Sequence, residues 1–242
     1  METVLIIAAF VIVIVILVFI LVQIEKFWSK RRCKAILPRA VDLGFTKTVA
    51  EGFSIKEHYP PFIALTPAYL TSDFIIQRQL DGEKQQHIFN IELRSGQGQC
   101  EKITFCLIHL PGINLPTFLI KGQDKMRFTM RLIHDVSRSA QTFIYHYHPV
   151  PVSTSETFQK HYQLLAPEGR DDFQEIFKPE LIQLFETHPE WQVEGMGEWL
   201  LFYRRGTLVK PSKFKDFVTE SMTIADAFFK AAKQTGASDG DH

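Results

Sequence analysis

The chain has 242 residues with 27 basic and 27 acidic side chains, so its formal net charge is zero. Beyond residue 34 it carries 22 basic and 25 acidic residues, a net charge near −3, which argues against a nucleic-acid-binding domain. The chain has three cysteines, Cys33, Cys100 and Cys106. A low and odd number does not suit a disulfide framework, and it indicates a reducing compartment.

The first element is the stretch Val4–Ile24, which has no charge, no Pro and no Gly. As a helix, its 21 residues would extend about 31 Å, close to the hydrocarbon thickness of a bilayer. Its many β-branched residues favour strands in water, but in lipid the backbone must bond within the segment, so we expect a helix. The stretch predicts a transmembrane anchor. A cleaved signal peptide is the alternative, disfavoured because the core is long and no basic residue precedes it.

The flank after the anchor is basic and aromatic. The positive-inside rule then places the N-terminus outside and the domain after residue 24 in the cytoplasm. Phe27 and Trp28 stand where an interfacial aromatic belt would lie. The basic residues are predicted at the membrane surface, where they either bind anionic headgroups or serve only as the topology signal. They are Lys26, Lys30, Arg31, Arg32 and Lys34. Cys33 is an ordinary interfacial cysteine or, alternatively, an S-acylation site.

Residues 25–44 predict a juxtamembrane helix, interrupted at Pro38 and stopped at Gly44. Short strands separated by turn residues follow, and their short connections predict an antiparallel meander. The predicted strands are 74–80, 87–93, 102–108 and 117–122. Cys100 and Cys106 would face the same side of one strand about 20 Å apart, too far for a disulfide.

The second half mixes strands and helices. We expect strands at 142–150 and 158–165, two short helices over 171–188 split at Pro179, and a hairpin of 191–195 with 198–205 across the segment 195–197. Asp171 is the expected N-cap of the first helix, and Ser212 that of a closing amphipathic helix. We expect the tail 234–242 to be disordered. Residues 45–233 form either one domain or two subdomains that meet near residue 150.

Several strings in the chain resemble a group of bacterial single-pass membrane proteins of unassigned function. These strings are LPTF (115–118), HYQLLAPE (161–168) and WQVEGMGEWLLFYRR (191–205), together with the segment from Arg39 to Phe45 at the start of the domain. The resemblance covers most of residues 35–230. It implies the same order of strands and helices, and a place in the bacterial inner membrane, but no activity.

Histidines give the best metal candidate. On a strand, His146 and His148 would point to one face, and His161 on a neighbouring strand could supply a third ligand. Only the pair follows convincingly from spacing, so the favoured interpretation is two solvated histidines. We therefore predict no metal and no cofactor.

Two features of the predicted hairpin have both a functional and a structural interpretation. Glu194 and Glu198 could act as paired acid–base carboxylates, but cross-strand ion pairs with Arg204 and Arg205 are the simpler explanation. The aromatic residues of the hairpin, Trp191, Trp199, Phe202 and Tyr203, form core or, alternatively, an exposed groove for a partner or lipid.

Together these features predict an α+β protein: an anchor (1–24), a basic helix (25–44), an antiparallel domain with a C-terminal helix (45–233) and a tail. The expected function is non-enzymatic binding or scaffolding at the cytoplasmic face of the membrane. The expected partners are the lipid bilayer and an unidentified protein, with no nucleic acid and no identifiable small-molecule substrate. The alternatives are a lipid-headgroup-contacting, pleckstrin-like module, suggested by fold analogy, and a metal-dependent enzyme that uses the histidines.

Overall fold

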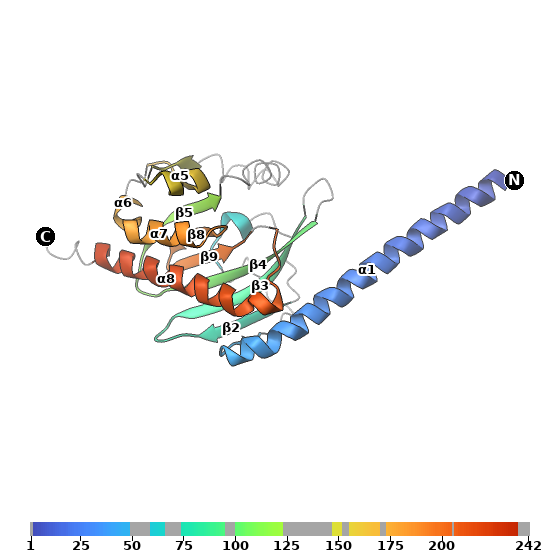
Figure 1. The fold of residues 1–242 in the computed structure, drawn as a ribbon, viewed down its shortest axis with the longest axis horizontal. Coiled ribbons are helices and arrows are strands. Elements are labelled where there is room, and N and C mark those ends of the chain that lie inside the picture. Colours follow the sequence, from blue (N-terminus) through green and yellow to red (C-terminus); the bar gives the residue numbers. More distant parts are fainter. Residues whose placement is uncertain are drawn as a thin grey trace.

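The computed structural model describes residues 2–48, 59–65, 74–94, 100–122, 147–151, 155–169, 173–204 and 206–236, and the statements below concern these residues. They form an α+β fold with one nine-stranded antiparallel sheet (Figure 1). The helices are α1 (Glu2–Asp42), η1 (Ile63–Leu65), α5 (Glu156–His161), α6 (Phe173–Ile176), α7 (Pro179–Thr187), η3 (Pro211–Lys213) and α8 (Phe214–Gly236). The strands are β1 (Thr46–Lys47), β2 (Ile75–Gln79), β3 (Gln85–Arg94), β4 (Cys100–His109), β5 (Leu115–Gly122), β6 (Tyr147–Pro149), β7 (Tyr162–Pro167), β8 (Gln192–Gly197) and β9 (Trp199–Tyr203).

The N-terminal helix α1 is one continuous element, with Pro38 inside it. The predicted interruption at Pro38 is therefore wrong. Proline removes one backbone hydrogen bond, but Ile36 and Ala40 on either side of it are buried in the core, and this packing offsets the loss. The predicted stop at Gly44 is confirmed. Gly44 has a φ of +81°, and the amide of Phe45 beyond it donates to the carbonyl of Ala40 at 2.9 Å.

The four strands predicted between residues 74 and 122 are all present, and β2, β3 and β4 follow one another as antiparallel neighbours. The simple meander is wrong beyond that point. The strand order is β1-β2-β3-β4-β9-β8-β5-β7-β6, so the late hairpin β8–β9 lies between β4 and β5. Strands from both sides of residue 150 thus belong to one sheet.

The predicted late hairpin is confirmed as β8 paired with β9, but its turn is tighter than expected, since Met196 pairs directly with Trp199. Gly197 forms the turn with a φ of +59°. Gly195 remains in the strand for a packing reason. A Cβ there would lie 2.2 Å from the ring of Phe118 on the adjacent strand β5, so a side chain would displace this core phenylalanine.

Several predicted boundaries in the second half need correction. The predicted strand 158–165 begins as helix α5, which Ser155 caps by accepting from the amide of Phe158, and becomes β7 at Tyr162. The two short helices are confirmed as α6 and α7. The closing helix is confirmed as α8, although Ser212 lies within η3 and α8 continues to Gly236 instead of fraying at residue 234. Asp171 lies outside the described residues, as do residues 142–146 of the predicted strand 142–150.

The sheet has a different cover on each face. Helices α5, α6, α7 and α8 and the last turns of α1 pack on one face and form the main core (Figure 1). On the other face, Tyr59, Phe62 and Leu65 around η1 cover a second cluster formed with β3, β4 and β9. The N-terminal half of α1 extends away from both layers (Figure 1).

Candidate functional site

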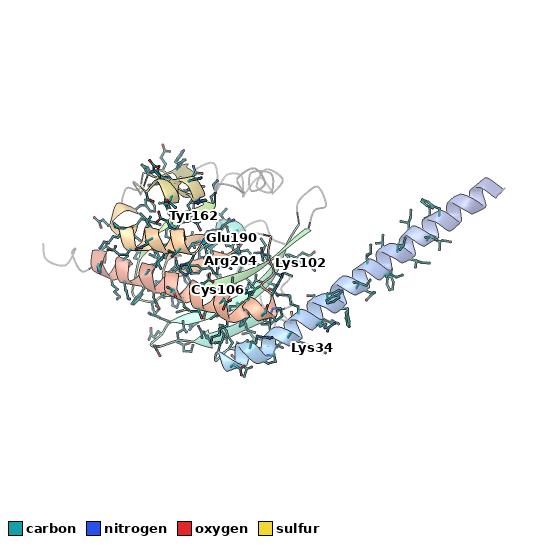
Figure 2. All side chains as sticks on the ribbon, in the orientation of Figure 1. Lys34, Lys102, Cys106, Tyr162, Glu190 and Arg204 are labelled. Carbon is teal, nitrogen blue, oxygen red and sulfur yellow. The ribbon has the colours of Figure 1, made fainter. Side chains whose placement is uncertain are left out.

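The N-terminal half of α1 carries the most unusual surface of the chain. Every side chain from Phe10 to Leu21 is apolar, and each is between 44% and 66% exposed. These residues cover all sides of the helix, because the run has no polar position. Figure 2 shows their side chains projecting from a helix with no other described element beside it. A helix that is apolar all round is normally buried in protein or lipid, so this segment, residues 10–21, lacks its cover.

The C-terminal half of the same helix is docked on the domain. Ile36 and Ala40 are each 1% exposed, and Cys33 and Leu37 pack against the same core. Arg32 Nη1 donates to the carbonyl oxygen of Val209, which precedes η3, at 2.9 Å. Because α1 is continuous, the free apolar half is joined to the domain without a flexible joint.

The described residues contain no helix that combines the length and the apolarity needed to cross a membrane. The predicted span Val4–Ile24 is therefore not supported by the structure. The side chain of Val4 is outside the described residues, whereas Ile24 is 46% exposed.

The structure places most of the predicted membrane-surface residues on the exposed side of α1. Phe27 and Trp28 are 61% and 59% exposed, and the guanidinium of Arg31 lies 5.6 Å from the ring centroid of Trp28. Lys30 and Lys34 are also exposed. Arg32 differs from the prediction: it is partly buried and binds the domain through Val209. The side chain of Lys26 is not among those described.

The candidate histidine cluster is not assembled by the described residues. His148 is exposed on β6 opposite Ala166, whereas His161 is exposed at the end of α5. Roughly 13 Å of β7 separates Ala166 from Tyr162, the residue after His161. His146 lies outside the described residues. In the part of the chain that the structure describes, no three His, Cys, Asp or Glu side chains are grouped to hold a metal ion.

Glu194 has a structural role that the sequence did not predict. Its carboxylate accepts from the amides of Ile63 at 2.6 Å and Ala64 at 3.0 Å, and from the hydroxyl of Tyr203 at 3.2 Å. Burial raises the pKa of Glu194 to about 7, although these three hydrogen bonds oppose the shift. The carboxylate therefore fixes η1 onto the sheet.

Glu198 has different partners. It accepts from the amide of Gly112 at 2.7 Å and lies 3.0 Å from Nε2 of His109. The Gly112 amide, and then His109, hold the pKa of Glu198 below its usual range. Glu194 and Glu198 thus have separate partners, and the hypothesis of a paired acid–base site is not supported.

The predicted cross-strand pairing of these glutamates with Arg204 is wrong. Arg204 instead binds Glu220 on α8 and lies with its guanidinium 4.5 Å from the ring centroid of Trp191. Trp191 Nε1 also donates to Glu220 at 3.1 Å. These three residues connect the hairpin to α8. Arg205 lies outside the described residues.

The aromatic residues of the hairpin belong to the core. Trp191 and Phe202 are fully buried on the helix-covered face, and Tyr203 is buried on the opposite face. Trp199 is partly buried against Tyr59 and His109. The exposed-groove alternative has no support among these four side chains. Cys106 is likewise fully buried, and burial raises the pKa of its thiol to about 11, so it is an inert core residue.

Comparison with known proteins gives one informative likeness. No protein-family model matches the chain, and no curated protein matches it. Among solved structures, the chain is similar to the crystal structure of the mycobacterial trehalose monomycolate transport factor A, TtfA. The TM-score is 0.52 at 11% sequence identity, and the match covers 83% of this chain and 92% of that one. At this identity the likeness establishes a shared fold.

Proposed function

We propose that this protein is a membrane-tethered, non-enzymatic binding protein, with the free apolar half of α1 placed in lipid and the α+β domain held at the membrane surface. The observation that carries the proposal is the exposure of residues 10–21, since an uncovered run of this kind is unfavourable in water.

Lipid fits this surface better than a protein groove would. An amphipathic helix that binds a groove has one apolar face and one polar face, whereas residues 10–21 are apolar on every side. The exposed aromatic residues Phe27 and Trp28 and the exposed basic residues Lys30 and Lys34 follow on the domain side. This order, apolar then aromatic then basic, is typical of a helix that leaves the hydrocarbon layer through the headgroups.

A finer proposal concerns topology. It is that the stretch Val4–Ile24, which includes side chains outside those described, crosses the bacterial inner membrane once, with the N-terminus outside and the domain in the cytoplasm. It is supported by the uncharged sequence of that stretch and the basic flank after it. A reporter fused after His242 that is active only in the cytoplasm is the expected result. Activity only on the outer side would overturn this topology.

The likeness to a trehalose monomycolate transport factor supports a lipid-related role, because that protein is named for the transport of a lipid. The support comes from fold alone. Within our proposal the domain binds a partner or lipid at the membrane, and no enzymatic step is assigned to it.

Vesicle flotation of the full-length protein tests the tether. We expect the native chain to float with neutral phosphatidylcholine vesicles. Val15→Lys combined with Phe19→Lys should reduce the floated fraction more than tenfold, because each lysine within lipid costs about 2.5 to 3.5 kcal/mol.

The matched control is Val41→Lys on the same helix. Val41 is also apolar and 65% exposed, but it lies beyond the free half, beside the domain. This variant should float like the native chain. Equal flotation of all three proteins, or no flotation of the native chain, would overturn the proposal.

A further inference from the structure

Two segments of the chain are basic and free of acidic residues. The first basic segment, residues 26–41, carries six Lys and Arg, and the second basic segment, residues 204–215, carries five. More than 160 residues of sequence separate them. Only the first segment stands out in the sequence, because the second is shorter and is divided by apolar residues.

The fold brings the two segments together. Arg32 in the first segment donates to the carbonyl of Val209 in the second at 2.9 Å, and η3 packs against α1. The ring of Phe45, just after α1, also contacts the ring of Phe214 at the start of α8, with centroids 6.1 Å apart. In Figure 1 the start of α8 lies beside α1 where that helix leaves the domain.

Some of these charges serve the fold. Arg204 binds Glu220, Arg39 donates to the carbonyl of Ala35 in its own helix, and Arg32 is partly buried. Six others are exposed among the described side chains, and these form what we call the two-segment basic surface. It consists of Lys30, Arg31 and Lys34 from α1, with Lys210 just before η3, Lys213 in η3 and Lys215 in α8.

Among the described residues, one member of this surface has an acidic neighbour. Lys213 lies 3.1 Å from Asp216, but both side chains are more than half exposed, so the pair neutralises the lysine only weakly. Otherwise the fold places like charges in adjacent elements, and such an arrangement is unfavourable until an anion binds between them.

The surface lies at the height of lipid headgroups if the apolar half of α1 is in lipid. Residues 24 to 32 advance about 12 Å along the helix axis, and a lysine side chain can extend back over much of that distance. The exposed aromatic side chains of Phe27 and Trp28 lie between the apolar run and the basic surface. The basic surface is therefore continuous with the proposed membrane-contact segment.

We infer that the two-segment basic surface binds the phosphate groups of anionic phospholipids in the leaflet next to the domain, with η3 and the start of α8 contributing alongside α1. This inference rests on the proposed membrane tether. Each Lys or Arg near an anionic membrane strengthens attraction by a factor of about five, so the second segment adds a substantial effect to that of the first. It also fixes which side of the domain faces the bilayer.

Lysine acetylation read by mass spectrometry tests the inference on the full-length protein. The protein is reconstituted in vesicles of phosphatidylcholine alone or of phosphatidylcholine mixed with phosphatidylglycerol. We expect Lys210, Lys213 and Lys215 to be acetylated about fivefold more slowly in the anionic vesicles, and high salt to remove the difference. Lys230, exposed near the other end of α8, is the internal control and should react equally in both.

The outcomes separate this inference from the tether. Failure to float with neutral vesicles overturns the tether itself. Normal flotation with equal acetylation of Lys210, Lys213 and Lys215 in both vesicles overturns the basic surface alone, as does protection confined to Lys30 and Lys34. Protection of the second segment by added RNA, but not by phosphatidylglycerol, would also overturn it, because the anion would then be a nucleic acid.

Discussion

The two long helices of the molecule, α1 and α8, differ in how their apolar side chains are covered. Helix α8 is amphipathic: Phe214, Phe217 and Phe228 are buried against the sheet, and its charged side chains face outward. The free half of α1 has apolar side chains on all sides and no cover. The docked half of α1 behaves like α8, with one buried face that includes Ile36 and Ala40. The difference shows that the core of the described domain is built without residues 10–21.

The sharpest test of this comparison truncates one phenylalanine in each helix. Phe228 is fully buried and contacts the rings of Phe118 and Phe177 at 5.3 and 5.7 Å. Phe228→Ala should lower the free energy of unfolding by about 4 kcal/mol, because it leaves a cavity in the core. Phe19→Ala, at a site 62% exposed, should change it by less than about 0.5 kcal/mol. Chemical denaturation measures both; equal losses would contradict the division of roles.

Within α1, the two halves can be separated in the same way. Ile36 is 1% exposed, so Ile36→Ala should cost roughly 3 kcal/mol in the free energy of unfolding while leaving flotation with vesicles unchanged. Val41→Ala, at a residue 65% exposed in the next turn of the helix, is the control and should affect neither. A loss of flotation in Ile36→Ala under native conditions would show that docking and membrane contact are coupled.

The domain and residues 10–21 of α1 also differ in their response to pH. Glu194 holds its proton with a pKa of about 7 in the folded domain, against a usual value of 4.5. The folded state therefore binds more protons than the unfolded state between these values. The contribution of protonated Glu194 to stability is therefore full below pH 4.5 and is lost as the pH rises through 7. We expect denaturation to show a decrease of about 3 kcal/mol in the free energy of unfolding over this range.

Glu194→Gln cannot ionise, so the curve of stability against pH should lose this component. Glu180→Gln, at an exposed position on α7, should keep it. Flotation should not follow the same curve, because residues 10–21 contain no titratable side chain. An unchanged pH profile in Glu194→Gln would contradict the assignment.

The smallest expected effect concerns the attachment of α8 to the hairpin. Glu220 accepts from Trp191 and binds Arg204, and both charged partners are 27% exposed. Glu220→Gln should cost about 1 to 2 kcal/mol in the free energy of unfolding, because it weakens two charge-assisted contacts. Asp216→Asn, which removes an exposed ion pair with Lys213, should cost less than about 0.5 kcal/mol. Equal costs would show that partial burial adds nothing to the first contact.

Local patterns predicted most individual elements of this fold. Alternating apolar residues located β2 to β5, and helical spacing located α6, α7 and α8. Their arrangement was not predictable in the same way. The insertion of β9 and β8 between β4 and β5 depends on pairing between Phe105 and Tyr203, nearly a hundred residues apart, and no local pattern encodes that register.

The candidate site residues also differ in whether they are contiguous in the sequence or are brought together by folding. The apolar run and its basic flank were visible in the sequence because they are contiguous. The role of Glu194 was not, because its partners Ile63 and Ala64 donate backbone amides, which leave no signature in the side-chain pattern. The second basic segment became significant only when folding placed it beside α1. The signal that could have indicated it is the absence of acidic residues from 204 to 215.

Because α1 is continuous through Pro38, the number of residues in this helix sets the direction in which the domain faces around the helix axis. Each residue of an α-helix turns the chain by about 100° and advances it by about 1.5 Å. Inserting one alanine near Ser29 would therefore rotate the whole domain about the helix axis and point η3 in a new direction. Inserting four alanines would nearly restore the original angle, and it would move the domain about 6 Å further along the helix axis from residues 10–21. A partner that must meet one particular side of the domain would distinguish these two insertions.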